Sequence, residues 1–459
     1  MKSLLKDKIK LYNLGFKEPS QRKYGYDYSV DNPTVLRNDT LIVSDNNSYI
    51  IYSPFTNMIT RVSEFPKKGT ILEDVLKRRG FFKSTPNTIH QDTKWTGFTS
   101  LTLLLTRKCN LRCIYCYASP SVDGPSMPCD LAIDALNWFV QQNQRPKVRI
   151  TFHGGGEPTL EQGLIQKVVA RAEEIKGNHP VHYLIVTNGT AKRSFLDWMM
   201  NHKFAITFSI DGPPEIQNRN RPFADGSPSS QVVENNIRYL VAKNYPVGVR
   251  LTYSSKDDIV QIIRYFGEIG IKRIHLEPLF PYGRYYKKVK FGNGSKYKVF
   301  SPETEDLLAK FLKAMDICKN YGMKIYNGHI MHFNKGIGYF CGAASGRAMV
   351  VTHDGLLTGC LEVVDSKDKE IKIFKIGDWV PSEKRFEVDM DKISILQKRH
   401  ADILPVCRNC FARYVCAGGC AVKAVRANQG FFGRDISYCD FTRAFVPILV
   451  KKIAVMSKI

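Results

Sequence analysis

The spacing of the cysteines constrains this chain more than any other feature. Of its twelve cysteines, ten fall into two groups, one before residue 120 and one after residue 340. Clustered cysteines in a reducing compartment usually hold metal, whereas an even number in a secreted chain favours disulfides. The first residues are interrupted by lysines and lack the apolar run of a secretory signal, so we expect a cytoplasmic, metal-binding protein. The groups are Cys109, Cys113 and Cys116, and then Cys341, Cys360, Cys407, Cys410, Cys416, Cys420 and Cys439.

Length and charge limit the domain number and the partners. A chain of 459 residues is long enough for two or three domains. Its 67 basic and 43 acidic residues give a net charge of +24, which favours acidic partners such as an acidic peptide or nucleic acid. No nucleic-acid motif accompanies this charge, and no apolar run reaches the ~18 residues of a membrane span. We therefore expect neither nucleic-acid binding nor a membrane partner.

Between residues 96 and 325, apolar strand patterns alternate with helical patterns. Six such units predict a parallel sheet with outer helices, and six is fewer than the eight of a closed barrel. We therefore expect a partial (β/α)6 barrel, with Asp130 as the N-cap of its first helix and a last helix near 303–321. The predicted strands are 101–105, 148–152, 182–186, 205–210, 247–253 and 273–276.

The segments on either side of this region have different patterns. Residues 1–95 predict a small α+β module, with short strands near 40–62 and a helix near 71–79. In residues 326–459 regular periodicity fades and cysteines dominate, which is typical of a domain ordered by metal. The sequence therefore predicts an α/β protein of three domains, 1–95, 96–325 and 326–459.

The first cysteine group follows an apolar strand and has the spacing C-x3-C-x2-C. Three thiolates on one loop can hold three irons of a cubane cluster and leave the fourth iron open. A zinc knuckle is the alternative. With Tyr115 before the last cysteine, the motif resembles the signature of the radical S-adenosylmethionine superfamily. This resemblance implies that Cys109, Cys113 and Cys116 are catalytic and hold a [4Fe–4S] cluster. It also implies that the open iron chelates S-adenosyl-L-methionine, whose cleavage gives a 5′-deoxyadenosyl radical.

Three later segments, each at the end of a predicted strand, resemble cofactor-contacting motifs of the same superfamily. They are HGGGEP at 153–158, TNGT at 187–190 and SIDGPP at 209–214. Parallel barrels place their chemistry at the carboxyl ends of the strands, which agrees with these positions. For the arginine that pairs with the cofactor carboxylate, Arg221 competes with Arg219. The resemblance implies that the cofactor-binding residues are Tyr115, Gly155, Gly156, Glu157, Asn188, Ser209 and Arg221.

The second cysteine group resembles the SPASM domain, a module that carries auxiliary clusters. The resemblance implies one cluster on Cys407, Cys410, Cys416 and Cys439 and another on Cys341, Cys360 and Cys420, so three [4Fe–4S] clusters in all. The second of these has no fourth cysteine nearby; its last iron is open or bound by a residue such as His332. Of the two cysteines outside the groups, we expect Cys318 to be a core residue and Cys129 to be structural.

Together these resemblances imply a peptide maturase that abstracts hydrogen from a ribosomally made precursor and installs a crosslink, such as a cysteine thioether. Residues 1–95 could then recognise a leader peptide by strand addition, and flavodoxin or ferredoxin would supply electrons. Anaerobic sulfatase-maturating enzymes, which make formylglycine, are an alternative. They carry an aspartate base directly after the cysteine matching Cys360, where this chain has Leu361. More distant alternatives are RNA modification and a non-catalytic iron–sulfur or zinc protein that binds nucleic acid.

Overall fold

The structure is a computed structural model that describes residues 10–13, 35–37, 40–56, 58–82, 95–142, 147–254, 257–279, 304–326, 338–407 and 410–456. The chain divides into two compact units. The large unit contains residues 95–327 and 346–396, and the small unit contains residues 1–94, 328–345 and 397–459. The chain leaves the large unit after residue 327, close to the predicted boundary at 326, but residues 346–396 return to it. His332 lies outside the described residues.

An eleven-stranded sheet organises the large unit, in the order β12-β11-β10-β9-β8-β7-β6-β13-β14-β15-β16. Neighbouring strands from β6 to β12 are parallel, as the alternation of strands and helices predicted. Closure into a partial barrel stays a prediction. The strands are β6 (Ser100–Leu103), β7 (Val148–Phe152), β8 (Val181–Thr187), β9 (Ala205–Ser209), β10 (Val247–Tyr253), β11 (Arg273–Pro278), β12 (Lys324–Tyr326), β13 (Ala348–Val351), β14 (Leu356–Thr358), β15 (Lys375–Val380) and β16 (Arg385–Val388).

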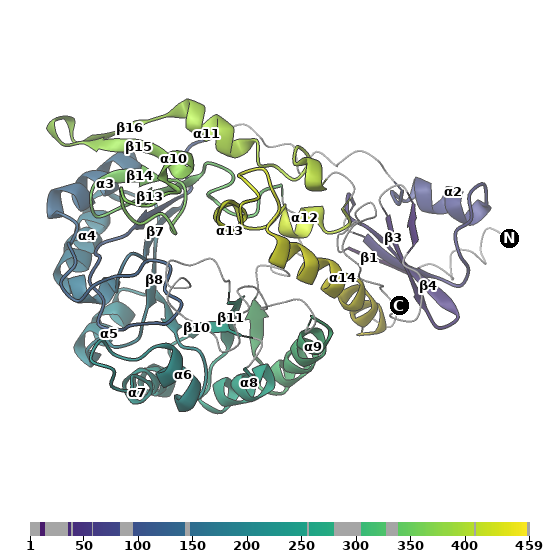
Figure 1. Cartoon of the computed structure of the whole chain (residues 1–459), viewed down its shortest axis with the longest axis horizontal. Coiled ribbons are helices and arrows are strands. Elements are labelled where there is room, and N and C mark those ends of the chain that lie inside the picture. The colour runs from purple at the N-terminus through teal and green to yellow at the C-terminus, as the bar shows by residue number, and fades with distance from the viewer. Residues whose placement is uncertain are drawn as a thin grey trace. The chain divides into compact units, whose positions relative to one another are not determined.

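Helices cover one face of this sheet, because every second residue of its strands is apolar (Figure 1). Ile150, Phe208 and Leu251 point to that face and are fully buried. The residues between them, such as Thr207 and Arg250, face the opposite side and are half-buried. The helices are α3 (Cys129–Gln142), α4 (Gln162–Ile175), α5 (Arg193–Asn201), α6 (Pro214–Asn220), α7 (Ser230–Ala242), α8 (Ile259–Glu268), α9 (Thr304–Asn320), α10 (Ile371–Phe374) and α11 (Met390–Gln397), with short 3-10 turns at Pro158–Glu161 and Pro381–Glu383.

Helix α3 begins at Cys129, two residues earlier than an N-cap at Asp130 predicts. The carbonyl of Pro128 accepts from the Ala132 N–H at 3.2 Å and so makes the first helical hydrogen bond. Asp130 therefore lies in the first turn, and its prediction as the N-cap was wrong. Its carboxylate still favours the helix dipole there. In α9, Cys318 is 3% exposed, and burial raises the pKa of its thiol to about 11, as expected of a core residue.

The small unit holds a five-stranded antiparallel sheet of order β1-β5-β4-β3-β2, where strands near 40–62 were predicted. One face packs on α2, whose N-cap Thr70 accepts from the Glu73 N–H while Glu73 accepts from the Gly69 N–H. The long helix α14 also packs against β3, β4 and β5. None of the described helices is long and apolar enough to cross a membrane. The elements are β1 (Lys10–Asn13), β2 (Val35–Arg37), β3 (Thr40–Asp45), β4 (Ser48–Ser53), β5 (Met58–Val62), α2 (Ile71–Arg78), α12 (Arg413–Cys416), α13 (Ala421–Arg426) and α14 (Ile436–Met456), with a 3-10 turn at Pro405–Cys407.

Candidate active site

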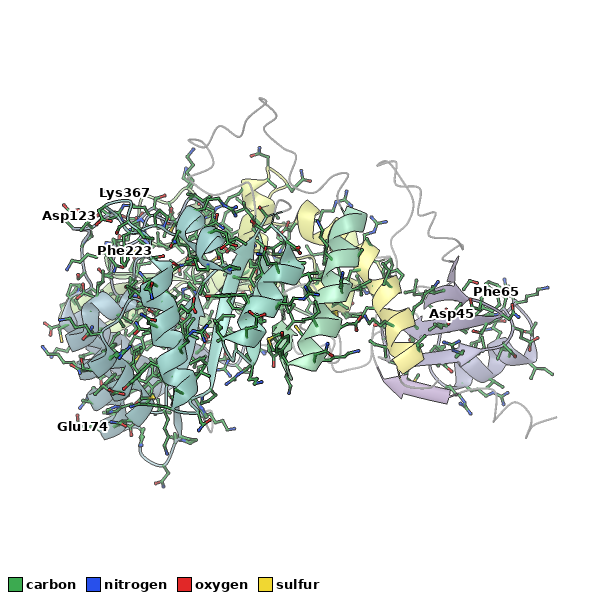
Figure 2. All side chains as sticks on the ribbon, turned by 90° about the horizontal axis from the view of Figure 1, so that it is seen from below. Asp45, Phe65, Asp123, Glu174, Phe223 and Lys367 are labelled. Carbon is green, nitrogen blue, oxygen red and sulfur yellow. The ribbon has the colours of Figure 1, made fainter. Side chains whose placement is uncertain are left out.

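The loop that follows β6 carries Cys109, Cys113 and Cys116, and backbone hydrogen bonds fix its path. The Cys109 N–H donates to the Ser121 carbonyl at 2.8 Å, so the loop folds back on itself. The loop also donates to carbonyls at the end of α6 and just after it, from Ile114 to Asn220 and from Arg112 to Pro222. Figure 2 shows Asp123 of this loop gathered with Phe223 and Lys367 at one end of the large unit, opposite Glu174. This is the end of the sheet where the sequence predicted the chemistry.

The three thiols of this loop are half-buried and act on one another. Burial, together with the charges of Glu157 and Cys116, raises the pKa of Cys109 to about 12. The pKa of Cys113 is also raised by burial and by Cys109 and Cys116, against the lowering effect of Arg221. A bound metal deprotonates such thiols outright. Among the described residues no three His, Cys, Asp or Glu side chains converge on one ion position. A cubane gives each thiolate its own iron, and three neighbouring thiols on one loop are the donor set that such a cluster uses.

Arg221 connects this loop to Asp211, at the end of β9. Its Nε lies 3.1 Å from Asp211 Oδ1, and its Nη1 lies 3.9 Å from Cys113 Sγ. The guanidinium also lies over the Tyr115 ring, 5.2 Å from the centroid, and the Tyr115 hydroxyl donates to Asp211. The competing Arg219 is half-exposed and pairs with Asp257. The structure therefore brings Arg221 to the cysteines and leaves Arg219 outside.

Asp211 is a functional residue that the sequence reasoning did not single out. It is fully buried, and besides Arg221 and Tyr115 it accepts from the Thr252 N–H at 2.9 Å and from Asn220 Nδ2 at 3.2 Å. These donors come from β10 and α6. A buried carboxylate needs such partners. Because Arg221 already has a carboxylate partner, its pairing with a cofactor carboxylate stays a prediction.

Glu157 joins the end of β7 to the end of β8. Its Oε1 accepts from the Thr159 N–H, the Thr159 hydroxyl and the Thr187 hydroxyl, and its Oε2 accepts from the Asn188 N–H at 2.6 Å. Burial raises the pKa of this carboxyl, which these donors oppose. Glu157 thus orders the loops around the site, and its Oε2 keeps room for one further donor.

Gly156 allows the glutamate loop to approach the cysteine loop. A Cβ at this position would lie 2.0 Å from the Lys108 carbonyl oxygen, and the Glu157 N–H donates to the same carbonyl at 2.7 Å. A Cβ on Gly155 would meet the Thr106 carbonyl at 2.8 Å, and Gly155 has a φ of +73°. Only glycine fits both positions without moving backbone.

Asn188 lies between two loops of the site. Its Nδ2 donates to Asn110 Oδ1 at 2.7 Å and lies 3.9 Å from Cys109 Sγ, while its Oδ1 accepts from Thr190. Asn110 in turn donates to the Thr190 hydroxyl at 2.9 Å. The structure therefore places Asn188 beside the first cysteine, where it can stabilise a thiolate.

Ser209 has a neighbour that the sequence reasoning missed. In the register of β9 and β10 it lies beside Arg250, and Arg250 in turn lies beside His275 of β11. Within the described residues the Arg250 guanidinium makes no hydrogen bond or ion pair. Its charge lowers the pKa of His153, so it lies near the end of β7 as well. The alternation of Val249, Arg250 and Leu251 was a signal that could have found it.

The predicted auxiliary cysteines lie in both units. In the small unit, burial raises the pKa of Cys407, Cys410 and Cys416, and each of these thiols is raised further by charges within the set that includes Cys439. These four residues are therefore brought together. Cys341 and Cys420 belong to the same unit, whereas Cys360 belongs to the large unit, after β14.

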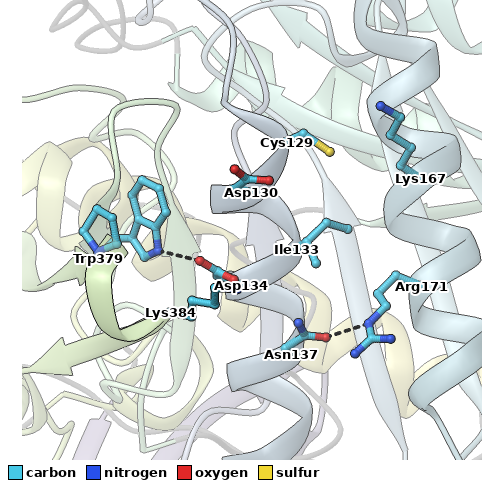
Figure 3. A pocket seen from close by; sticks show the side chains of 10 residues that line it. Cys129, Asp130, Ile133, Asp134, Asn137, Lys167, Arg171, Trp379 and Lys384 are labelled. Atoms are coloured by element: carbon cyan, nitrogen blue, oxygen red, sulfur yellow. Dashed lines mark hydrogen bonds between the residues drawn. The ribbon is translucent and has the colours of Figure 1, made fainter.

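A separate cavity of about 620 Å³ lies between α3, α4 and β15 in the large unit (Figure 3). Asp134 accepts from Trp379 Nε1 at 3.1 Å on one wall, and Arg171 donates to Asn137 at 2.9 Å on another. Cys129 lines this cavity. No predicted cofactor-binding residue lines it, so it is distinct from the candidate active site.

Residues 103–266 match the Radical SAM superfamily, so this part of the chain is a radical SAM domain. The chain is 29% identical over 188 residues to an uncharacterized protein of Methanocaldococcus jannaschii, covering 40% of this chain and 64% of that protein. It thus spans less than two thirds of that relative's length. It is 24% identical over 335 residues to the cysteine-type anaerobic sulfatase-maturating enzyme of Clostridium perfringens, covering 68% of this chain and 85% of the enzyme.

Solved structures share the fold. The structure of anSMEcpe with bound AdoMet and Cp18Cys peptide matches with a TM-score of 0.62 and 19% identity, covering 79% of this chain and 100% of that one. Streptococcus suis SuiB bound to the precursor peptide SuiA matches with a TM-score of 0.52 and 15% identity, covering 86% of this chain and 84% of that one. The mixed α/β architecture with a large parallel sheet is therefore that of radical SAM proteins.

Proposed function

We propose that this chain is a radical S-adenosylmethionine peptide maturase of the SPASM type, which installs a cysteine thioether crosslink. The observation that carries the proposal is the meeting of one three-cysteine loop with Glu157 and Asn188, at the ends of β7 and β8, and with Arg221, directly after α6. The match of residues 103–266 to the Radical SAM superfamily supports the chemistry. Fold neighbours solved with bound peptides support a peptide as the substrate.

Each residue of the site has a defined task in this proposal. Cys109, Cys113 and Cys116 would hold a [4Fe–4S] cluster, which with S-adenosylmethionine supplies a 5′-deoxyadenosyl radical that removes a hydrogen atom from the peptide. Asn188 and Arg221 donate toward Cys109 Sγ and Cys113 Sγ and so offset thiolate charge. The other residues predicted to contact the cofactor shape and order the surrounding loops. The Tyr115 hydroxyl donates to Asp211, Gly155 and Gly156 let the loops approach each other, and Glu157 accepts from the Asn188 N–H. Ser209 faces the same side of the sheet.

The auxiliary cysteines would hold two further [4Fe–4S] clusters. The proximity of Cys407, Cys410, Cys416 and Cys439 supports a fully ligated set. Cys341, Cys360 and Cys420 would form a second set with three protein thiolates. We assign its last position to a cysteine of the substrate, which would hold that sulfur ready for attack on the carbon radical.

Leader recognition and electron supply complete the proposal. The sheet of the small unit ends in strands β1 and β2, and a leader peptide could add as a further strand at one of these edges. The net charge of +24 suits an acidic leader. A flavodoxin or ferredoxin would supply the electrons.

A second candidate is formylglycine formation, which the similarity to the sulfatase-maturating enzyme favours. The position after Cys360 weighs against it. Leu361 packs there against an apolar cluster that contains Leu104, Val350 and Val364, so it cannot act as a base. Glu362 follows Leu361. The pKa of Tyr117 is raised mainly by burial, and the charge of Glu362 raises it as well.

The experiment that tests the proposal uses the full chain, reconstituted anaerobically, with a cysteine-bearing precursor peptide encoded beside its gene. We expect reductant-dependent 5′-deoxyadenosine and a peptide that has lost two hydrogen atoms but kept its sulfur. Loss of the sulfur would instead identify formylglycine formation. The triple Cys109→Ala, Cys113→Ala, Cys116→Ala variant should make no 5′-deoxyadenosine, and retained cleavage would overturn the assignment of the radical site.

A further inference from the structure

A fully buried arginine, Arg399, lies at the centre of the cysteine-rich part of the small unit. It is 0% exposed, and its guanidinium donates only to backbone carbonyls. Nη2 donates to Gly418 at 2.9 Å and to Gly419 at 3.5 Å, and Nη1 donates to Gly433 at 2.9 Å and to Phe431. In the described part of the chain, no carboxylate lies within ion-pair distance of it. Since arginine stays protonated in proteins, its buried charge has no paired counter-charge.

The predicted auxiliary cysteines surround this charge. A Cβ on Gly418 would lie 3.5 Å from Cys407 Sγ and 3.7 Å from Arg399 Nη2, so the thiol and the guanidinium lie next to the same glycine. Cys420 directly follows Gly419, whose carbonyl accepts from Arg399.

Cys341 approaches from another segment. The Ala401 N–H donates to the Gly338 carbonyl at 2.8 Å, which places residues 338–341 beside residues 399–401. Phe340 also packs against the apolar cluster that contains Ala401. The charges of Cys420, Cys407 and Cys341 each act on Arg399 more strongly than that of the buried Asp435. The proposed function assigns Cys407 to one auxiliary cluster and Cys341 and Cys420 to the other.

Resting on that proposed function, we propose that Arg399 is the shared counter-charge of the two auxiliary clusters. A cation at this place stabilises the more negative, reduced form of each cluster and so raises its reduction potential. Burial makes the effect larger than at the surface, because the low dielectric screens the charge less. The hydrogen bonds to Gly418 and Gly419 hold the guanidinium at this place. Arg399 is thus a positioning residue for electron transfer.

Arg413 provides a matched control. It is a second buried arginine of the same unit, 6% exposed, and its charge also acts on Cys407, though less strongly than that of Arg399. Unlike Arg399, it has a carboxylate partner, Asp402, at 3.6 Å, and its guanidinium lies over the Phe55 ring. Because its charge acts on Cys407 less strongly than that of Arg399, its removal should change the field at the cysteines less.

The experiment compares Arg399→Gln, Arg399→Lys and Arg413→Gln in the full chain with Cys109, Cys113 and Cys116 changed to Ala, so that only auxiliary clusters give a signal. Iron content and an anaerobic redox titration followed by electron paramagnetic resonance are measured. We expect Arg399→Gln to disfavour the reduced clusters about tenfold, a shift of about 59 mV to lower potential for a one-electron couple. Arg399→Lys keeps the charge and should stay near the parent, and Arg413→Gln should shift the potential less than Arg399→Gln does.

Each of the other outcomes either supports the inference or overturns a stated proposal. Full iron with an unmoved potential in Arg399→Gln, or an equal shift in Arg413→Gln, would overturn this inference alone. If Arg399→Gln loses iron while Arg399→Lys keeps it, the charge is needed to hold the clusters and the inference stands. Loss of iron in both would mean that Arg399 only organises the carbonyls, which overturns it. A parent chain that binds no auxiliary iron would instead overturn the proposed function.

Discussion

Asp211 and Arg221 form a buried ion pair, with Nε and Oδ1 3.1 Å apart, at the edge of the cysteine loop. Arg219, two residues before Arg221, instead pairs with Asp257 and is half-exposed. Two arginines of one short segment therefore differ in burial and in partner. This contrast separates a role at the cysteines from a role at the surface.

The first prediction uses that contrast. Arg221→Gln leaves Asp211 buried without its cation, which typically costs about 3–5 kcal/mol of folding free energy. Arg219→Gln removes a half-exposed partner and leaves buried Asp257 with its hydrogen bonds from the Ser254 N–H and hydroxyl, so it should cost less, about 1 kcal/mol. Urea unfolding of both variants measures the difference. Equal stability of the two variants would show that the Asp211 pair does not hold this edge of the sheet.

Gly156 gives the second prediction. Gly156→Ala places a methyl group 2.0 Å from the Lys108 carbonyl oxygen, so the cysteine loop must shift. We expect loss of most iron at the radical site and at least a hundredfold loss of S-adenosylmethionine cleavage. Gly163→Ala is the matched control, because it lies in the first turn of α4 with nothing within 4 Å, and it should be neutral or stabilising by up to about 1 kcal/mol. Normal iron content in Gly156→Ala would contradict this packing role.

The strands and the cysteine loop were predictable because their signals are local. Val148–Phe152 and Val247–Tyr253 carry alternating apolar residues, and the structure has strands with those same bounds. Residues 346–396 were not predictable as part of the same unit. Their strands are short, and β13 pairs with β6, nearly 250 residues earlier, so nothing in the local pattern of Ala348–Val351 indicates its partner.

The sequence could predict which residues belong to the site, but not which of them contact one another. The motifs indicated Glu157 and Asn188, yet the hydrogen bond between them joins two loops that are about 30 residues apart. The sequence likewise could not tell that Asp211 partners Arg221, because that depends on how α6 turns back after β9. Residue type indicates what a side chain can do, and the register of the sheet decides which side chains meet.

The third prediction concerns pH. Both ring nitrogens of His153 are buried, with no hydrogen-bond partner among the described residues, and burial together with Arg250 lowers its pKa to about 3. The unfolded chain takes up a proton near pH 6.5, which the folded chain does not, so stability falls as the pH drops below that value. One such group costs about 1.4 kcal/mol by pH 5.5. Urea unfolding at pH 7.5 and 5.5 measures this loss, which His153→Gln should reduce by that amount. An unchanged pH dependence in the variant would rule out His153 as its source.

The last prediction concerns Arg250, which lies beside Ser209 on the helix-free face of the sheet without a bonded partner in the described residues. A half-buried guanidinium in this position is suited to a carboxylate, and one charged hydrogen bond is worth about 1.5–3 kcal/mol, or roughly ten- to a hundredfold in affinity. Arg250→Gln should therefore weaken binding of S-adenosylmethionine by that factor in equilibrium dialysis.

The matched control is Arg149→Gln. Arg149 lies in β7, on the same face of the sheet as Arg250, but it is exposed near the start of its strand, so this change should leave the affinity for S-adenosylmethionine unchanged. If Arg250→Gln keeps its affinity for S-adenosylmethionine and instead raises the KM for the peptide, the carboxylate belongs to the substrate. Because Ser209, Arg250 and His275 are neighbours in register, either result identifies what this face of the sheet binds. Unchanged values for both ligands would refute a binding role for Arg250.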